Sequence, residues 1–216
     1  MPLSDKGILA ARERGDIVIE PFDIRNLGTD SYDVRLGDTF FTEKDEGSRE
    51  LVFNMFGENC VRGTWEMCKA VPWEMGFADG WKPGDRFFPL EPGETILAHT
   101  QEFIGAVRGH TTKMFARSSV GRAMIGVCKC AGRGDVGFFN RWTMEITSFS
   151  RHHMIPLKVG MRIAQIEFLP VGETLRCYGA THGKYQGSSD LAEVMASWRP
   201  EMMLPRLDKD WELQNG

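Results

Sequence analysis

The chain has 216 residues, of which 42% are hydrophobic and 26% charged, and its formal net charge is −4. Such a length and balance indicate one large globular domain, and the acidic total argues against a general nucleic-acid binder, which would display a basic surface. No charged-then-apolar leader opens the chain and no apolar run reaches the ~18 residues of a membrane span, so we expect a cytoplasmic protein without membrane contact.

The first predicted element is a helix that begins after Ser4. Ser4 is a suitable N-cap, and Leu3 and Ile8 have the spacing of a hydrophobic staple. Gly15 is suited to the C′ position, where the helix would end.

Short β-type runs follow at residues 17–19, 32–36 and 39–41. Glycine or proline separates these runs, which favours an all-β domain over alternating strands and helices.

Residues 43–86 interrupt this rhythm. They contain Trp65, Cys68, Trp73 and Trp81 without a clean period. We interpret the segment as an insertion of short helical or irregular pieces that packs onto the main sheet, and its aromatic side chains as local core rather than a binding surface.

Strand patterns return after residue 87. A turn is predicted at residues 90–94, a strand at 95–98, and two strands within 154–169. The last ~30 residues have little periodicity, so from about residue 179 we expect a mobile or partner-draping tail. Residues 1–216 are thus predicted to form a single domain with one insertion and a flexible tail.

A cluster of possible phosphate ligands lies at residues 117–122. Arg117, Ser118, Ser119 and Arg122 offer guanidinium and hydroxyl donors within six residues. The plainer interpretation is a polar loop whose arginines form surface ion pairs.

A Gly-rich turn at residues 133–137 contains Asp135. By default such an aspartate bonds its own backbone, whereas a buried one could accept a hydrogen bond from a sugar hydroxyl. In the strand that follows, alternation places Thr143 and Glu145 on one face. On pattern alone this face would be solvated, but a meander that folds the cluster and the turn beside Glu145 would bury it. Burial would raise the pKa of Glu145 toward neutrality, as proton transfer requires.

The tail carries a ring, an ammonium group and an amide in Tyr178, Lys184 and Gln186. These side chains either face solvent or form a lid that closes over phosphates.

Zinc is not expected. Cys128 and Cys130 form C-x-C rather than C-x-x-C, and the H-x-E and P-C-x-x-C motifs of zinc deaminases are absent. The five histidines show no ligand spacing.

Together these segments resemble the dCTP deaminase branch of the trimeric dUTPase superfamily. The motifs that carry the resemblance are, in chain order, Leu3-Ser4-Asp5, Ile19-Glu20-Pro21, Ser31-Tyr32-Asp33-Val34-Arg35-Leu36-Gly37, Leu90-x-Pro92-Gly93-Glu94, Arg117-Ser118-Ser119-x-Gly121-Arg122, Ala131-Gly132-x-x-Asp135-x-Gly137-Phe138, Glu145, Gly160-x-Arg162-Ile163-Ala164-Gln165, and Tyr178-Gly179 with Lys184-Tyr185-Gln186-Gly187.

The resemblance implies a mainly β fold, a distorted β-barrel or jelly roll with an N-terminal helix. It implies a homotrimer with active sites between subunits, and hydrolytic deamination of dCTP to dUTP and ammonia. Mg²⁺ would accompany the triphosphate, and dTTP is a candidate inhibitor.

Site roles also follow from the resemblance. Glu145 would be the general acid and base, Ser118 and the backbone carbonyl of Ala131 would hold the attacking water, and Arg122 would orient Glu145. Arg117 and Ser119 would bind phosphates, with a subunit boundary as a possible crossing point. The other implied nucleotide-binding residues are Asp135 for the 3′-hydroxyl, Thr143 on the face of Glu145, and Tyr178, Lys184 and Gln186 from the tail.

Three departures from the family pattern stand out. Gly134 and Val136 flank Asp135 where the family usually has an apolar residue and often a proline, which would loosen the turn. Residues 127–130 replace a His/Thr-type run, which would alter the response to dTTP. Residues 43–86 have no obvious counterpart.

Two other enzymes and one non-enzyme remain as alternatives. A bifunctional deaminase would also release pyrophosphate and give dUMP, and a plain dUTPase shares Asp135 with both. Glu145 favours deamination, because a simple dUTPase needs no acid on that strand. A nucleotide-sensing protein on the same scaffold would bind without turnover.

Overall fold

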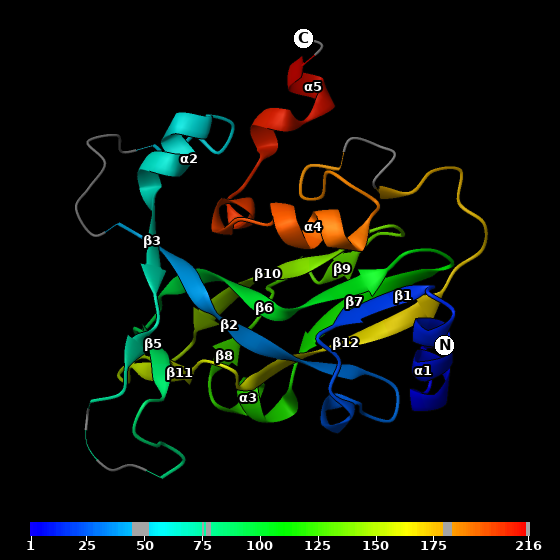
Figure 1. Ribbon diagram of the computed structural model, residues 1–216. Coiled ribbons are helices and arrows are strands. Elements are labelled where there is room, and N and C mark those ends of the chain that lie inside the picture. Colours follow the sequence, from blue (N-terminus) through cyan, green and yellow to red (C-terminus); the bar gives the residue numbers. More distant parts are fainter. Residues whose placement is uncertain (45–51, 75, 77–78, 179–182, 215–216) are drawn as a thin grey trace.

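The computed structural model describes residues 1–44, 52–74, 76, 79–178 and 183–214 (Figure 1). The helices are α1 (Asp5–Glu13), α2 (Glu58–Thr64), α3 (Ser118–Arg122), α4 (Leu191–Ser197) and α5 (Trp211–Gln214), with 3-10 turns η1 (Ile24–Asn26), η3 (Pro200–Met203) and η4 (Leu207–Lys209). The strands are β1 (Ile17–Glu20), β2 (Tyr32–Glu43), β3 (Trp65–Lys69), β4 (Val71–Pro72), β5 (Arg86–Leu90), β6 (Thr95–Ala106), β7 (His110–Ala116), β8 (Ile125–Gly126), β9 (Arg133–Gly134), β10 (Phe139–Ser148), β11 (Ile155–Lys158) and β12 (Arg162–Pro170).

Within the described residues, a nine-stranded antiparallel sheet has the central order β8-β10-β6-β2-β12-β7-β9, with β1 added on β6 and β3 on β2. A second sheet has the order β11-β5-β4. The large sheet curls (Figure 1). Side chains such as Leu36, Ile104 and Met144 are fully buried and belong to one hydrophobic core. The predicted mainly β fold is confirmed.

The N-terminal helix has the predicted limits. The Ser4 hydroxyl accepts a hydrogen bond from the Gly7 N–H at 3.3 Å, and Gly15 has a φ of +72° just after the helix. Ile8 is completely buried, which fastens α1 to the core.

The two strands expected at residues 32–36 and 39–41 are one strand, β2. The glycine between them is not a break in the strand, because a Cβ at Gly37 would lie 2.1 Å from the ring of His99 on β6. Pairing between β2 and β6 shifts register between Leu36 and Phe40 at this point. Gly37 therefore allows a close approach inside a continuous strand.

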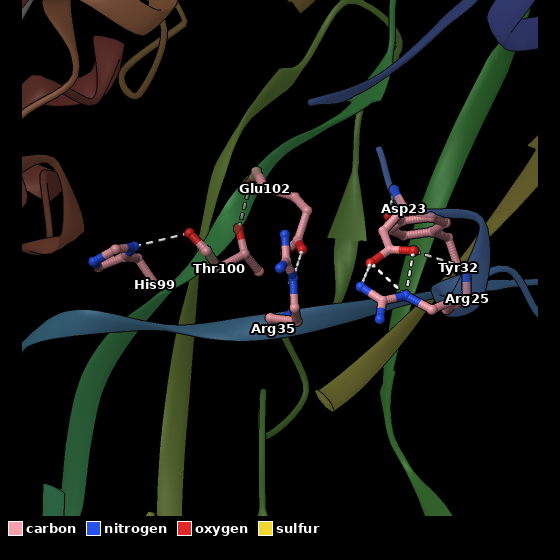
Figure 2. Close-up of polar contacts among 7 residues, drawn as sticks. All are labelled: Asp23, Arg25, Tyr32, Arg35, His99, Thr100 and Glu102. Atoms are coloured by element: carbon pink, nitrogen blue, oxygen red, sulfur yellow. Dashed lines mark hydrogen bonds and ion pairs between the residues drawn. The ribbon is translucent and has the colours of Figure 1, made fainter. Parts of the chain in front are cut away.

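Polar contacts on β6 tie the central strands together (Figure 2). The fully buried carboxylate of Glu102 accepts hydrogen bonds from Nε of Arg35 at 2.6 Å and from its backbone N–H at 2.9 Å. The Thr100 hydroxyl donates to the Glu102 carbonyl at 2.7 Å, and Nδ1 of His99 donates to the Thr100 carbonyl at 2.8 Å. Because Glu102 is paired, its burial is tolerated.

Part of the segment interpreted as an insertion, residues 45–51, 75 and 77–78, lies outside the described residues. The described part contains α2, β3 and β4, and β3 pairs with β2 along its length. Trp73 stacks on Trp81 at 4.0 Å between ring centroids, and both rings contact Phe87 edge-on. These rings form a local aromatic cluster.

The C-terminal part differs from the tail that we expected. Residues 183–214 contain α4, η3, η4 and α5, and Figure 1 shows α4 above β10 and β6. Met203 and Leu204 are buried in one cluster with Phe41, Val61 and Leu97. Apolar burial at a few positions, which has no regular period, holds this segment on the sheet. None of the described helices is long and apolar enough to cross a membrane.

Candidate functional site

A groove of about 1850 Å³ runs along β10, with walls from β2, β3, the turn before β10 and the C-terminal segment. Six of the candidate site residues line it, namely Ala131, Asp135, Thr143, Glu145, Tyr178 and Lys184. The groove is larger than the usual pocket for a small ligand, so it has room for a nucleotide.

Glu145 lies in the middle of β10, where it pairs with Leu97 of β6. The predicted alternation is confirmed, since Trp142, Met144 and Ile146 are buried whereas Thr143 and Glu145 are half-buried along the groove. Within the described chain, Oε2 of Glu145 is buried without a hydrogen-bond partner. Burial raises the pKa of Glu145, and the Lys129 ammonium group opposes part of this rise. This carboxyl group is therefore suited to gain and lose a proton.

The loop that precedes the Gly-rich turn brings a cation to the groove. Lys129 has a φ of +39°, is exposed and lines the groove with Ala131. Cys128 points into the core, where its thiol donates to the Met114 carbonyl at 3.5 Å. In this run the cysteine is a packing residue and the lysine faces the groove.

The turn around Asp135 is packed rather than loosened. A Cβ at Gly134 would lie 2.3 Å from the Thr112 hydroxyl and 2.6 Å from the Trp142 ring. Trp142 fills this space, and its Nε1 donates to the Ile104 carbonyl at 2.8 Å. We expected Gly134 to weaken the turn; instead it makes room for the indole that supports it.

Tyr178 lies against this turn. Its ring meets Phe138 edge-on at 5.3 Å between centroids, and its N–H donates to the Val136 carbonyl at 2.7 Å. Burial raises the pKa of Tyr178, so the hydroxyl stays protonated at neutral pH. Lys184 lines the same part of the groove and forms an ion pair with Asp210.

Gln186 is fixed to the backbone on both sides of its amide. Its Oε1 accepts from the Phe139 N–H at 2.8 Å, and its Nε2 donates to the carbonyls of Gly137 at 2.8 Å and Ser188 at 3.0 Å. The side chain is buried and joins the C-terminal segment to the start of β10.

The cluster of possible phosphate ligands at residues 117–122 lies outside the groove. Arg117, Ser118 and Ser119 line a second, smaller hollow with residues 28–31, and Arg122 is exposed on α3. Figure 1 shows α3 across the sheet from α4. Within one chain, therefore, no meander brings the cluster beside Glu145: β7 ends at α3, on the side of the sheet away from α4.

Arg141 and Trp198 are among the groove residues that we did not identify from the sequence. Arg141 lies two residues before Thr143 on the same face of β10, so the alternation that we applied to Glu145 also predicts it. Trp198 lies 4.6 Å (ring centroid) from the Arg141 guanidinium carbon, but no sequence pattern placed it there. The described residues contain no group of three or more His, Cys, Asp or Glu side chains that would hold a metal ion.

Comparisons with known proteins agree with this geometry. A family model described as dCTP deaminase-like matches residues 2–171. A protein of Methanopyrus kandleri named "dCTP deaminase, dUMP-forming" is 33% identical over 191 residues, which cover 86% of this chain and 90% of that protein. A "dCTP deaminase" of Haloarcula marismortui is 32% identical over 194 residues, covering 88% and 91%.

Among solved structures, the 2′-deoxycytidine 5′-triphosphate deaminase of Agrobacterium tumefaciens has a similar fold, with a TM-score of 0.55 at 18% identity. The match covers 81% of this chain and 50% of the other, so the chain spans half the length of that protein.

Proposed function

The chain belongs to the dCTP deaminase-like family, and from this premise we propose that it deaminates dCTP by hydrolysis with Glu145 as general acid and base. The observation that carries the proposal is the buried, unpartnered oxygen of Glu145 in a groove that also contains Ala131 and Asp135. A carboxyl group whose pKa is raised toward neutrality can act as base and then as acid in one cycle.

The proposed reaction adds water to C4 of cytosine. Glu145 accepts a proton from the water as its oxygen bonds to C4, and passes that proton to N3. It then moves a second proton from the C4 hydroxyl to the amino group, the C4–N bond breaks, and ammonia leaves with C4 as the carbonyl of uracil. The backbone carbonyl of Ala131, a residue that lines the groove, would accept a hydrogen bond from the attacking water.

The rest of the nucleotide would extend from this point along the groove. Asp135 would accept the 3′-hydroxyl, Thr143 would contact the base, and Tyr178 and Lys184 would lie beside the phosphates. Gln186 would act through the turn that it fastens, since backbone groups engage both ends of its amide.

A neighbouring copy of the chain would complete the site. Arg117, Ser118, Ser119 and Arg122 lie across the sheet from Glu145, and their hollow is open to solvent in the single chain. We place them in the groove of a second subunit, with Arg117 and Ser119 on phosphates, Ser118 on the water and Arg122 beside Glu145. Repeated by threefold cyclic symmetry, this arrangement would give the homotrimer that the family resemblance implies.

Mg²⁺ would enter with the substrate. Because the described residues hold no cluster of metal-binding side chains, triphosphate oxygens would supply the main ligands, as is usual for this ion. dTTP, which shares the sugar and triphosphate, is the proposed inhibitor.

A variant tests the role of Glu145. Glu145→Gln retains the shape of the side chain but cannot carry protons, so we expect ammonia release to fall by at least about 100-fold while dCTP binding is retained. Ammonia is measured by a coupled assay and binding by calorimetry. Near-normal turnover in this variant would rule out the assigned role.

A second product is a specific alternative, because the relative from Methanopyrus kandleri is named dUMP-forming. Chromatography of the products after incubation with dCTP, and separately with dUTP, shows whether the final product is dUTP or dUMP. dUTP that accumulates from dCTP and is itself untouched indicates a deaminase alone, and dUMP from either substrate indicates the bifunctional enzyme. No turnover of either nucleotide would contradict the proposal and favour a nucleotide sensor.

A further inference from the structure

Arg141 is a half-buried cation of the groove without a charged partner. Its guanidinium carbon lies 5.0 Å from the ring centroid of Phe103, its cross-strand neighbour on β6, and 4.6 Å from that of Trp198. Its Nε is buried and has no hydrogen-bond partner, and no ion pair of Arg141 occurs within the described chain. Two aromatic rings thus hold the guanidinium group, and its buried Nε has no hydrogen-bond acceptor.

The two carboxylates whose charges act on Arg141, Asp38 and Glu102, each pair with another arginine. Asp38 forms an ion pair with Arg86 at 3.6 Å, and both oxygens of Glu102 accept hydrogen bonds from Arg35. Burial lowers the pKa of Arg141, which reflects the cost of removing the charge from water. An anionic ligand would offset this cost.

The surroundings of Arg141 are those of the proposed phosphate end of the groove. The neighbouring Asn140 donates from Nδ2 to the Tyr185 carbonyl at 2.9 Å, which brings β10 next to residues 184–185. At this end, Lys184 is already paired with Asp210. Arg141 lines the same groove as Lys184 and is a half-buried cation without a charged partner in the described chain.

We propose that Arg141 is a further nucleotide-binding residue, which donates hydrogen bonds to a phosphate group of the triphosphate while Phe103 and Trp198 fix the plane of its guanidinium group. A planar guanidinium group suits two phosphate oxygens at once, and stacking reduces the conformational freedom lost on binding. Trp198 lies beyond residues 2–171, so the C-terminal segment of this chain supplies part of the device. This inference rests on the proposed function, because it assumes that the nucleotide occupies the groove.

The test compares the binding of dCTP and 2′-deoxycytidine by calorimetry. In Arg141→Met, which keeps an apolar stem between the two rings, we expect dCTP to bind about tenfold more weakly and deoxycytidine to bind within about twofold of the unaltered protein. Arg141→Lys should recover part of the loss for dCTP. Arg108→Met is the matched control, because Arg108 pairs with Asp16 outside the groove and its loss should change neither affinity.

Each outcome has a defined meaning. Equal losses for both ligands in Arg141→Met, or no loss for dCTP, would overturn the inference, since the first indicates that Arg141 only fastens the C-terminal segment. Thermal melting of each variant shows whether the fold is retained. Trp198→Leu, which keeps the charge of Arg141 but removes one of its two rings, is a second variant that should weaken the binding of dCTP more than that of deoxycytidine. If the unaltered protein binds neither ligand, the proposed function itself fails, and this inference fails with it.

Discussion

At the scale of single residues, the groove contains a carboxyl group, that of Glu145, whose charged form is disfavoured by burial. Glu145 has a buried oxygen without a partner in the described chain, and burial raises its pKa. A group whose pKa is higher in the folded than in the unfolded chain binds its proton more tightly when folded. Its contribution to stability is therefore present at low pH and is lost as the pH rises through the folded-state pKa.

We therefore predict that Glu145→Gln is relatively more stable than the unaltered protein at pH 7.5 but not at pH 4. The expected difference is on the order of 1 kcal/mol or less, because solvent still screens a half-buried group. Urea unfolding at several pH values measures it. Glu13→Gln alters an exposed carboxyl group of α1 and should follow the unaltered protein; an identical pH dependence for all three would argue against a strained Glu145.

Several residues of the site could be predicted from the sequence. The others show which information a sequence pattern does not contain. Alternation along β10 places Thr143 and Glu145 correctly, and it would have placed Arg141. Alternation cannot tell a solvated face from a groove, because that depends on what covers the strand. Here Trp198 and its neighbours cover it, from a segment that has no regular period.

At the scale of elements, two glycines allow side chains to pack closely. Gly37 admits the His99 ring into the gap between β2 and β6, and Gly134 admits the Trp142 ring beneath the turn of Asp135. From the sequence both glycines are predicted to be breaks or weak points, because glycine occurs in turns as well as at close approaches. The distinction needs the partner ring, which lies more than 60 residues away for Gly37 but only eight for Gly134.

For Gly134 we predict that substitution by alanine destabilises the fold by roughly 1–3 kcal/mol, since the added methyl group displaces Trp142 or Thr112. Deamination should fall together with stability, because the turn carries Asp135. Thermal melting and ammonia release measure the two effects. Gly63→Ala is the control: Gly63 lies in α2 with open space around its Cβ, so this change should be neutral or slightly stabilising. Similar melting temperatures for both variants would contradict the packing argument.

The C-terminal segment acts as a cover for β6 as well as a wall of the groove. Trp198 lies 4.7 Å from His99 between ring centroids, and His99 is almost completely buried. Burial lowers the pKa of His99 to about 4. A histidine that is neutral in the fold costs stability when it must be protonated, so the protein should lose stability as the pH falls below about 6.5, the ordinary value for histidine.

Trp198→Ala should therefore raise the pKa of His99 above 4 and toward its ordinary value, and should weaken the acid sensitivity of the fold. Proton NMR titration of the imidazole resonances measures the pKa directly. Trp73→Ala, which removes a ring that stacks on Trp81, is the control and should leave His99 unchanged. An unchanged titration in Trp198→Ala would mean that β2 and β6 alone keep His99 from water.

At the scale of the whole molecule, the functional side chains are divided between two sides of one sheet. The groove holds Glu145, Ala131 and Asp135, whereas Arg117 and Ser118 line a hollow with residues 28–31. Both groups lie within 30 residues of the sequence. Their closeness in the sequence does not indicate that they occupy different sides of the sheet. β7 leads the chain to α3, which lies on the side of the sheet away from α4, and the chain then returns through β8 and β9 to β10, which carries Glu145.

Two halves of a site on one chain can meet when copies associate by cyclic symmetry, each copy giving one half to its neighbour. If this holds, Glu145→Gln and Arg122→Ala are each inactive alone but complement one another in mixed oligomers. In a random one-to-one mixture, a site is intact when one subunit has Glu145 and the next has Arg122, so about a quarter of the sites should recover. A site built within one chain would recover none, because no subunit in the mixture carries both residues.

The measurement is ammonia release from dCTP after co-expression of the two variants with different affinity tags and purification of the mixed oligomer through both. Each variant co-expressed with itself gives the background, and gel filtration gives the oligomeric state. Purification through both tags removes the unmixed trimers, and each mixed trimer has one intact site of three, so recovery near a third of normal activity would support shared sites. A mixed oligomer as inactive as its parents, or a protein that elutes as a monomer yet turns over dCTP, would mean that Arg122 does not reach Glu145 from a neighbouring copy.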